Sequence, residues 1–275
     1  DLDLSESLDA GQPILRVRKV TKKYGNFKAV DDVSMDILTN RVTCILGHNG
    51  AGKTTLINCI CGMTKPSQGQ IFLKDKDVFS SESVLAGRVG YCTSRDVLYE
   101  DLTVGEFLTF IAILKGVKDV HEHVIQVIRK CTLQSYTTSL IKNLSGGTKR
   151  RTTIASAVIG EPEIVIMDEP SSGVDPENRR QLWALIESLK DHKTALILTT
   201  HHLEEAEYLS TDVIIMDRGK VEIRGSPYDI CMKFGIGYRI TVDNIRDEHQ
   251  KNFVETNISQ ILGQAKTSFS DTNFM

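Results

Sequence analysis

The sequence lacks a long hydrophobic run and a strong excess of either charge. No apolar stretch approaches the roughly 20 residues that a membrane helix needs, and we recognise no signal peptide. The formal net charge is only −3, which excludes broad electrostatic binding to nucleic acid or to anionic lipid. We therefore expect no nucleic-acid partner, and we expect any role at a membrane to come through partner proteins.

The cysteines show none of the spacings that bind a metal ion. Cys59 and Cys61 are too close together to form a C-x-x-C pair, and several cysteines lie inside apolar segments. This pattern favours buried free thiols of a reducing compartment over disulfides. The six cysteines are Cys44, Cys59, Cys61, Cys92, Cys131 and Cys231.

The composition is that of an ordinary globular protein. Hydrophobic residues make up 40% of the 275 residues and charged residues 25%, which is enough for a substantial core in one large domain or two small ones. Residues 1–12 are acidic and polar, and we predict that they form a linker or are disordered. Because the chain does not begin with Met, we expect it to be a fragment of a longer protein.

The hydrophobic pattern predicts an α/β fold with a mixed sheet. Alternation from residue 14 to about 40 indicates an antiparallel β subdomain, and helical spacing between about 100 and 160 indicates an inserted helical subdomain. We predict a loop at 66–69 followed by a strand at 70–73. Buried strands separated by helical patterns predict a parallel sheet with crossovers. These strands are expected at 42–46, 164–167, 195–198 and 213–216.

The end of the chain carries weaker signals. We predict a short helix from Pro227 to Phe234 and a strand at 238–242. The tail beyond residue 243 is more polar, and only apolar residues at helical spacing around 254–262 suggest an amphipathic helix there.

The central motif is an octet with the pattern G-x-x-x-x-G-K-[ST] between a buried strand and the start of a helix. Glycines let backbone N–H groups converge on one anion, and the helix N-terminus adds its positive dipole end. Lys53 would reach the β- and γ-phosphates of a nucleotide, and the Thr54 hydroxyl would be a Mg²⁺ ligand. A chance glycine-rich turn is the alternative, and the flanking strand and helix disfavour it. The nucleotide-binding residues predicted here are Gly47, His48, Asn49, Gly50, Ala51, Gly52, Lys53, Thr54 and Thr55.

Carboxylates and a histidine follow two of the predicted strands. Asp168 ends the strand at 164–167, where it can hold the Mg²⁺ hydration shell opposite Thr54. Glu169 is placed to orient or deprotonate an attacking water, and His201 can contact a γ-phosphate. The alternatives are a polar strand end and a structural histidine. His202 is predicted to be a surface residue.

A second candidate anion site precedes another helix. Ser145 is predicted to cap a helix at 148–159, and Gly146 and Gly147 expose backbone N–H groups at its N-terminus. The alternative is a capped helix without a ligand.

Taken together, these motifs resemble the nucleotide-binding domain of an ATP-binding cassette (ABC) transporter over about residues 14–235. The octet matches the Walker A motif, 144–147 the signature motif, and 164–168 the Walker B motif, with Glu169 as the catalytic glutamate. His201 matches the switch histidine, Asp175 ends a D-loop-like segment, and Tyr24 matches the aromatic residue that stacks on adenine. The family's fold is a RecA-like P-loop NTPase, which we therefore expect at 13–235.

Finer features resemble the ABCA subfamily of lipid exporters, at 46–54, 90–92, 200–206 and 234–238. In that subfamily the following segment begins a regulatory domain, so 236–275 are expected to be its first part. One departure stands at Ser94, where the family has a Gln that reaches the Mg²⁺. A Ser is too short for this contact, although a bridging water can substitute.

The resemblance implies an ATPase at the cytoplasmic face of a membrane. Two such domains would enclose ATP head-to-tail, each signature motif closing on the other domain's nucleotide, and the helical subdomain would transmit the cycle to transmembrane domains. The expected cofactors are ATP and Mg²⁺, and the expected cargo is lipid. The alternatives are a soluble ABC ATPase acting on ribosomes or DNA and a degenerate cassette with a regulatory role. A simple kinase or GTPase is disfavoured, because it does not need the signature-like segment 144–147.

Overall fold

The computed structural model describes residues 13–81, 84–190 and 193–234. The chain divides into two units, Asp1–Phe234 and Gly235–Met275, and all of the described residues lie in the first. The predictions made above for 1–12, 238–242, 254–262 and the extension 236–275 lie outside the described residues.

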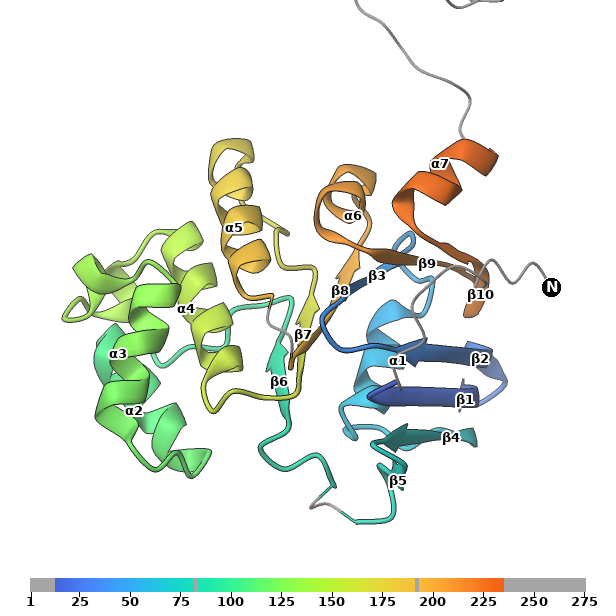
Figure 1. Ribbon diagram of the computed structural model, residues 1–275, viewed down its shortest axis with the longest axis horizontal. Helices are drawn as coiled ribbons and strands as arrows, with labels where there is room; N and C mark the ends of the chain where they lie inside the picture. The colour runs from blue at the N-terminus through green and yellow to red at the C-terminus, as the bar shows by residue number, and fades with distance from the viewer. Residues whose placement is uncertain (1–12, 82–83, 191–192, 235–275) are drawn as a thin grey trace, which may run out of the picture. The chain divides into compact units, whose positions relative to one another are not determined.

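The centre of the first unit is a six-stranded mixed sheet of order β10-β9-β3-β8-β7-β6 (Figure 1). Strands β9, β3, β8, β7 and β6 run parallel, and β10 pairs antiparallel with β9 at one edge. Strands β3, β7 and β8 are nearly continuous buried runs, as expected for strands covered on both faces. The strands are β3 (Val42–Leu46), β6 (Val89–Cys92), β7 (Ile164–Asp168), β8 (Ala195–Thr200), β9 (Asp212–Asp217) and β10 (Lys220–Gly225).

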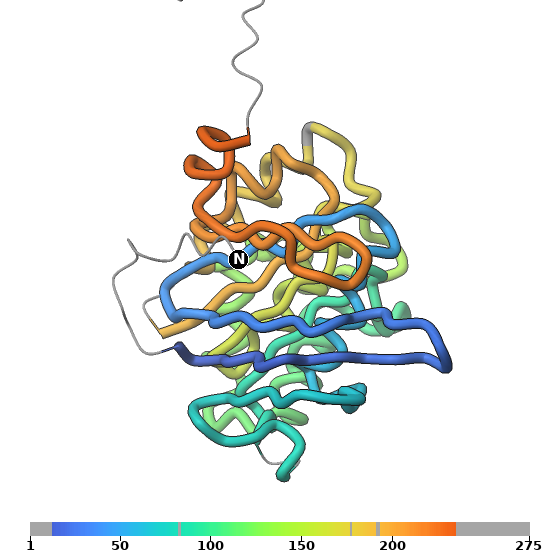
Figure 2. The backbone as a smooth tube through the Cα atoms, turned by 90° about the vertical axis from the view of Figure 1, so that its right-hand side faces the viewer, coloured from blue at the N-terminus to red at the C-terminus, as the bar shows by residue number. Residues whose placement is uncertain are grey.

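A four-stranded antiparallel sheet of order β2-β1-β4-β5 lies beside it (Figure 2). Its β4 begins two positions before the predicted strand, because Gln68 pairs with Thr21 of β1. Gly69, assigned above to a loop, therefore lies within the strand, and a Cβ there would lie 2.3 Å from the carbonyl oxygen of Lys19. The strands are β1 (Leu15–Tyr24), β2 (Phe27–Ile37), β4 (Gln68–Leu73) and β5 (Lys76–Asp77).

The parallel strands separate two hydrophobic cores, because successive side chains of a strand point to opposite faces of the sheet. Ile164 and Ile166 of β7 join the core shared by helix α1 (Lys53–Ile60) and the antiparallel sheet. Val165 and Met167 join the core beneath the other helices that flank β7. Helix α1 and those helices therefore lie on opposite faces of β7, to its right and left in Figure 1.

The predicted helical subdomain is a group of three α-helices and two short 3-10 helices. Its first helix starts with a capping box in which Thr103 and Glu106 satisfy each other's backbone N–H groups. The third starts at Gly146, two residues before the predicted position, directly after its N-cap Ser145. The helices are α2 (Val104–Leu114), α3 (Val120–Lys130), α4 (Gly146–Val158), η3 (Gln134–Tyr136) and η4 (Ile141–Asn143).

The C-terminal end of α4 is capped by a lysine from the end of α2. The Nζ atom of Lys115 donates hydrogen bonds of 3.0, 3.1 and 2.8 Å to the carbonyl oxygens of Ser156, Ala157 and Ile159. These are carbonyls at the negative end of the helix, where an ammonium is favourable. Burial lowers the pKa of Lys115 to about 8. The lysine therefore joins α2 to α4.

Three more α-helices complete the part of the first unit that the structure describes. Helix α5 (Pro176–Ser188) begins after its N-cap Asp175 with a proline at the first helical position, as predicted. Helix α7 (Pro227–Phe234) also agrees with the prediction. Helix α6 (Leu203–Leu209) and strand β10 were not predicted. The buried face of α6 includes Glu205, so its apolar pattern is weak. In β10 the apolar Val221 and Ile223 alternate with charged residues, which is a strand pattern, although a short one.

The cysteines are free thiols, and the prediction of burial is wrong for Cys231. This residue is exposed, because α7 has no buried residue among those described. Cys61 is half-buried, whereas Cys44, Cys59, Cys92 and Cys131 are buried. Among the residues that the structure describes, no helix is long and apolar enough to cross a membrane.

Arg150 joins its own helix α4 to two other segments, the residues 168–170 at the end of β7 and the loop after β6. Its side chain is only 3% exposed, and its guanidinium donates to the carbonyl oxygens of Pro170 at 2.7 Å, Asp168 at 3.1 Å and Glu169 at 3.0 Å. It also donates to the carbonyl oxygen of Thr93 at 2.6 Å and to the carboxylate of Asp96 at 3.2 Å, both in the loop after β6. A flexible ammonium cannot reproduce this planar set of donors.

We expect Arg150→Met to lower the free energy of unfolding by about 3 kcal/mol, because it leaves buried acceptors and Asp96 without their donor. Chemical denaturation of the 275-residue chain measures this change. The control is Arg151→Met. Arg151 is half-buried and donates to the hydroxyls of Thr132 and Thr148, so we expect a loss below about 1 kcal/mol. Equal losses in the two variants would contradict this account of Arg150.

Candidate functional site

The predicted phosphate loop, residues 47–54, connects the carboxyl end of β3 to the start of α1. The N–H of Gly47 donates to the carbonyl oxygen of Thr200 at 3.2 Å, which fixes the loop to β8. Gly52 has a φ of 102°, and a Cβ there would lie 2.3 Å from the carbonyl oxygen of Ala29. A side chain is therefore excluded at Gly52 by backbone conformation and by space. Gly52 is also the N-cap of α1 and has no side chain to cap it, so the first amides of the helix can face an anion.

Lys53 lies between this loop and the end of β7. Its side chain is 5% exposed, and Nζ donates to the carbonyl oxygens of Gly47 at 2.7 Å and His48 at 3.2 Å. The same atom lies 3.8 Å from Oε1 of Glu169. The ammonium is thus held at the inner edge of the loop, where it can reach a phosphate bound by the loop amides.

Oxygen atoms from α1 and β7 meet beside this lysine. The Thr54 hydroxyl donates to Oδ2 of Asp168 at 3.2 Å, and the Thr199 hydroxyl donates to Oδ1 of the same carboxylate. Asp168 is 2% exposed. A hydroxyl next to a carboxylate fits Mg²⁺, which prefers oxygen and takes its remaining ligands from water and phosphates. Within the described ranges there is no cluster of three or more His, Cys, Asp or Glu that could form an all-protein metal cage.

Glu169 and His201 lie at the same edge of the sheet. The N–H of Glu169 donates to the carbonyl and hydroxyl oxygens of Thr199 at 3.1 and 3.0 Å, and the residue has a φ of 47°. This left-handed conformation is costly for a residue with a side chain, so the backbone is strained at this position. Oε1 of Glu169 lies 3.4 Å from Nδ1 of His201 and close to the Lys53 ammonium. A carboxylate, an imidazole and an ammonium therefore converge.

The signature-like residues occupy a different place. Ser145 caps α4, its Oγ accepting from the N–H of Thr148 at 3.3 Å, and a Cβ added at Gly146 would meet nothing within 4 Å. Asp175 caps the adjacent helix α5, where Oδ1 accepts from the N–H of Asn178 at 3.1 Å. Helices α4 and α1 pack on opposite faces of β7, so the predicted second anion site belongs to a helix on the other side of the strand from the helix that follows the phosphate loop.

Tyr24 and Ser94 lie outside the converging group. Tyr24 ends β1 and is 52% exposed, and Nζ of Lys22 lies 5.3 Å from its ring centroid. Ser94 is exposed in the loop after β6, and its side chain makes no hydrogen bond to the rest of the described chain. His202, predicted to be a surface residue, is half-buried, with its ring centroid 4.0 Å from that of His201.

Sequence reasoning missed three functional neighbours: Arg150, Thr199 and Asp217. Thr199 is paired with Asp168 in the parallel register of β7 and β8. Since both strands were predicted, the hydroxyl of Thr199 could have been expected beside the Asp168 carboxylate. Asp217 contacts His48 of the phosphate loop, 169 positions away in the chain, and no local pattern indicates it.

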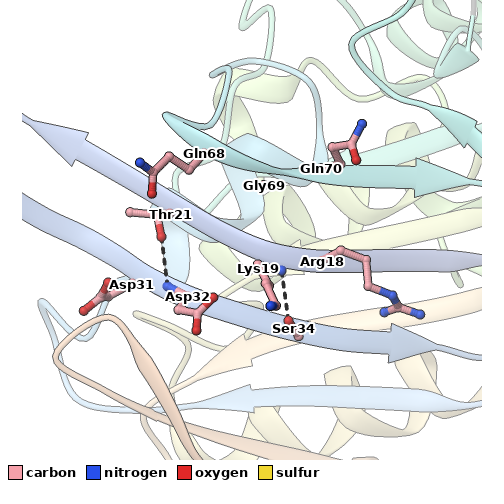
Figure 3. Close-up of a pocket in the computed structure, with 9 residues that line it drawn as sticks. All are labelled: Arg18, Lys19, Thr21, Asp31, Asp32, Ser34, Gln68, Gly69 and Gln70. Carbon is pink, nitrogen blue, oxygen red and sulfur yellow. Dashed lines mark hydrogen bonds between the residues drawn. The ribbon is translucent and has the colours of Figure 1, made fainter.

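A separate groove of about 610 Å³ crosses the antiparallel sheet (Figure 3). Hydroxyls satisfy backbone groups inside it, since Ser34 accepts from the N–H of Lys19 and Thr21 from that of Asp32. None of Lys53, Glu169 and His201 lines this groove. The groove is therefore separate from the candidate site at the edge of the central sheet. The groove is lined by Arg18, Lys19, Thr21, Asp31, Asp32, Ser34, Gln68, Gly69 and Gln70.

Comparison with known proteins agrees with this geometry. The family model described as "ABC transporter" matches residues 30–172. The glucosylceramide transporter ABCA12 of Homo sapiens is 39% identical over 227 residues, which are 81% of this chain and 9% of that protein. ATP-binding cassette sub-family A member 2 of Rattus norvegicus is 36% identical over 233 residues, 83% of this chain and 10% of that protein. The chain thus spans about a tenth of the length of these curated relatives.

Solved cassettes have the same fold. CbiO1 from Clostridium perfringens, described as part of the ABC transporter complex cbiONQ, is 26% identical with a TM-score of 0.74, covering 82% of this chain and 92% of that one. The dimeric bacterial cassette MJ0796 is 23% identical with a TM-score of 0.69, covering 78% and 98%. The predicted P-loop NTPase fold is therefore confirmed. With the phosphate loop, the Asp168–Glu169 strand end and the family match in agreement, the chain belongs to the ABC transporter family, as an ATP-binding cassette similar to those of subfamily A.

Proposed function

We propose that this cassette binds ATP with Mg²⁺ and hydrolyses it to power the movement of a lipid across a membrane. The observation that carries the proposal is the convergence of Lys53, Thr54, Asp168, Glu169 and His201 at one edge of the central sheet. Lipid is proposed as the cargo because ABCA12, a similar protein, is named as a glucosylceramide transporter.

Nucleotide binding would use both sheets. The amides of the phosphate loop and the Lys53 ammonium hold the phosphates, and Tyr24 offers an exposed ring for stacking on adenine. Thr54 and Asp168 would hold Mg²⁺, which neutralises charge on the phosphate oxygens.

Hydrolysis would be carried out by Glu169 and its neighbours. Glu169 takes a proton from water as the water oxygen attacks the γ-phosphorus and the bond to the bridging oxygen of ADP breaks. His201, held 3.4 Å from Oε1 of Glu169, orients this carboxylate, and Lys53 stabilises the charge that moves onto the phosphate oxygens.

A second cassette would complete the site. Ser145, Gly146 and Gly147 would form an anion site at the start of α4, which packs on the face of β7 opposite α1, and this supports a site completed by another chain. We infer a head-to-tail pair in which each α4 N-terminus closes on the partner's ATP. The similar fold of dimeric MJ0796 supports this arrangement.

Transmembrane partners would bind an exposed apolar patch, which would place the cassette at the cytoplasmic face of a membrane. The patch is formed by the loop after β6 and the adjacent face of α2, where the rings of Tyr99 and Phe110 meet edge to face with centroids 5.8 Å apart. Exposed apolar side chains that cluster in this way mark interaction sites. The members of the patch are Val97, Tyr99, Phe110, Ile113 and Leu114.

The first prediction of this proposal concerns Glu169. We expect Glu169→Gln to lower ATP hydrolysis at least about a hundredfold, because the amide cannot accept the proton from water. The same variant should accumulate an ATP-bound dimer. Phosphate release and size-exclusion chromatography with ATP measure the two effects. The control is Glu222→Gln, on the exposed edge of β10, which should behave as wild type. Undiminished hydrolysis by Glu169→Gln would refute the role of Glu169.

The second prediction concerns Ser94. We expect Ser94→Gln to raise the turnover number at least about threefold, or roughly 0.7 kcal/mol in the barrier, because the longer side chain can reach the Mg²⁺ ligand sphere. Ser94→Ala is the matched control and should leave turnover at or below the wild-type level. If Ser94→Gln is no faster, a bridging water already replaces the amide. Absence of turnover in every variant would favour the second candidate function, a cassette that binds ATP and has a regulatory role.

The third prediction tests the lipid cargo and the membrane partner together. In the parent transporter reconstituted in vesicles, we expect ATP-dependent movement of a fluorescent lipid, and we expect Tyr99→Asp to lower it at least about tenfold by charging the apolar patch. ATP hydrolysis by the isolated 275-residue chain should be unchanged by the same substitution. Lipid movement that persists in Tyr99→Asp would exclude this patch as the docking site, and ATP-dependent movement of other cargo alone would exclude lipid.

A further inference from the structure

The phosphate loop lies directly against the turn between β9 and β10. The N–H of Gly219 donates to the carbonyl oxygen of Ala51 at 2.9 Å. A Cβ added at Gly47 would lie 2.5 Å from the carbonyl oxygen of Met216, and one added at Gly52 would lie 3.3 Å from Cα of Gly219. The loop therefore makes close backbone contact with the turn at Gly219 and with the end of β9 at Met216.

One side chain adds a link across the same contact. Nε2 of His48 lies 2.7 Å from Oδ1 of Asp217, and Nδ1 lies 2.6 Å from the carbonyl oxygen of Asn49. A carboxylate and a carbonyl oxygen only accept hydrogen bonds, whereas a neutral imidazole has a single N–H to donate. Both contacts can be hydrogen bonds at once only when the ring carries two protons, so the geometry favours the imidazolium form of His48.

The charges around this ring agree with the geometry. The Asn49 carbonyl and the Asp217 carboxylate raise the pKa of His48 above its usual value, and the Lys53 ammonium opposes them. Arg218, the next residue of the turn, lies with Nε 3.7 Å from Oδ2 of Asp217. Since the His48 side chain is 62% exposed, solvent screens these interactions and their effect is modest.

We propose that His48 is a positioning residue that, in its doubly protonated form, fastens the phosphate loop to the β9–β10 turn through Asp217. Deprotonation leaves one N–H for two acceptors, so one of the two contacts is lost and the loop amides become less well ordered for a phosphate. Ordering a binding loop before the ligand arrives reduces the entropy lost on binding. Nucleotide affinity should therefore fall as pH rises through the pKa of His48.

This inference rests on nucleotide binding as proposed above, and its first test is independent of nucleotide. We expect an NMR titration of ¹⁵N-histidine-labelled 275-residue chain to give His48 a pKa above 6.5, and Asp217→Asn to lower it. A His48 pKa at or below 6.5, or one that Asp217→Asn leaves unchanged, would overturn the proposal. If the wild type bound no nucleotide, the proposed function would fail. This titration would still decide whether protonated His48 pairs with Asp217.

The second test measures affinity for a non-hydrolysable ATP analogue with Mg²⁺ between about pH 6 and pH 8.5. Across this range we expect the wild type to lose about threefold more affinity than His48→Gln, the size expected of one exposed ion pair. His48→Arg, which keeps its charge, should retain affinity at high pH. The control His121→Gln, in α3, should follow the wild type. An identical pH dependence in the wild type and His48→Gln would overturn the proposal.

Discussion

The buried guanidinium of Arg150 is the interaction on which the candidate site depends. A charge that is 3% exposed must have its donors satisfied, and the five acceptors that satisfy them come from the loop after β6 and from the residues at and beyond the end of β7. Three of these acceptors are the backbone carbonyls of Asp168, Glu169 and Pro170. Arg150 therefore connects the strained backbone of Glu169 to α4, the helix that begins at the signature-like motif.

The alternation of side chains in β7 has an equally direct effect on function. Its two faces support separate cores, which place α1 and α4 on opposite faces of the strand. Both helices begin with glycine-rich segments, and they lie on the two sides of the strand. This arrangement of two glycine-rich helix starts supports the paired cassette proposed above.

The local parts of the site could be predicted from the sequence, and the non-local parts could not. The octet at 47–54, the strand ending at Asp168 and the Ser145 cap are contiguous patterns in which residue type and spacing determine the backbone. Arg150, Thr199 and Asp217 act through contacts with segments distant in the chain. Helix α6 was missed because Glu205 occupies a buried position that a periodic pattern needs to be apolar. Strand β10 was missed although Val221 and Ile223 alternate with charged residues, because two apolar positions make only a short pattern. The roles of all the predicted site residues, Tyr24, Asp175 and Ser94 among them, remain predictions.

The β9–β10 turn has one further consequence. Gly219 accepts from the N–H of Asp31 in β2 at 2.8 Å and donates to the phosphate loop at Ala51. The same turn thus connects the antiparallel sheet, where Tyr24 ends β1, to the loop that precedes α1. A ligand that stacked on Tyr24 and filled the loop would therefore have to span two parts of the fold that this turn joins through its backbone.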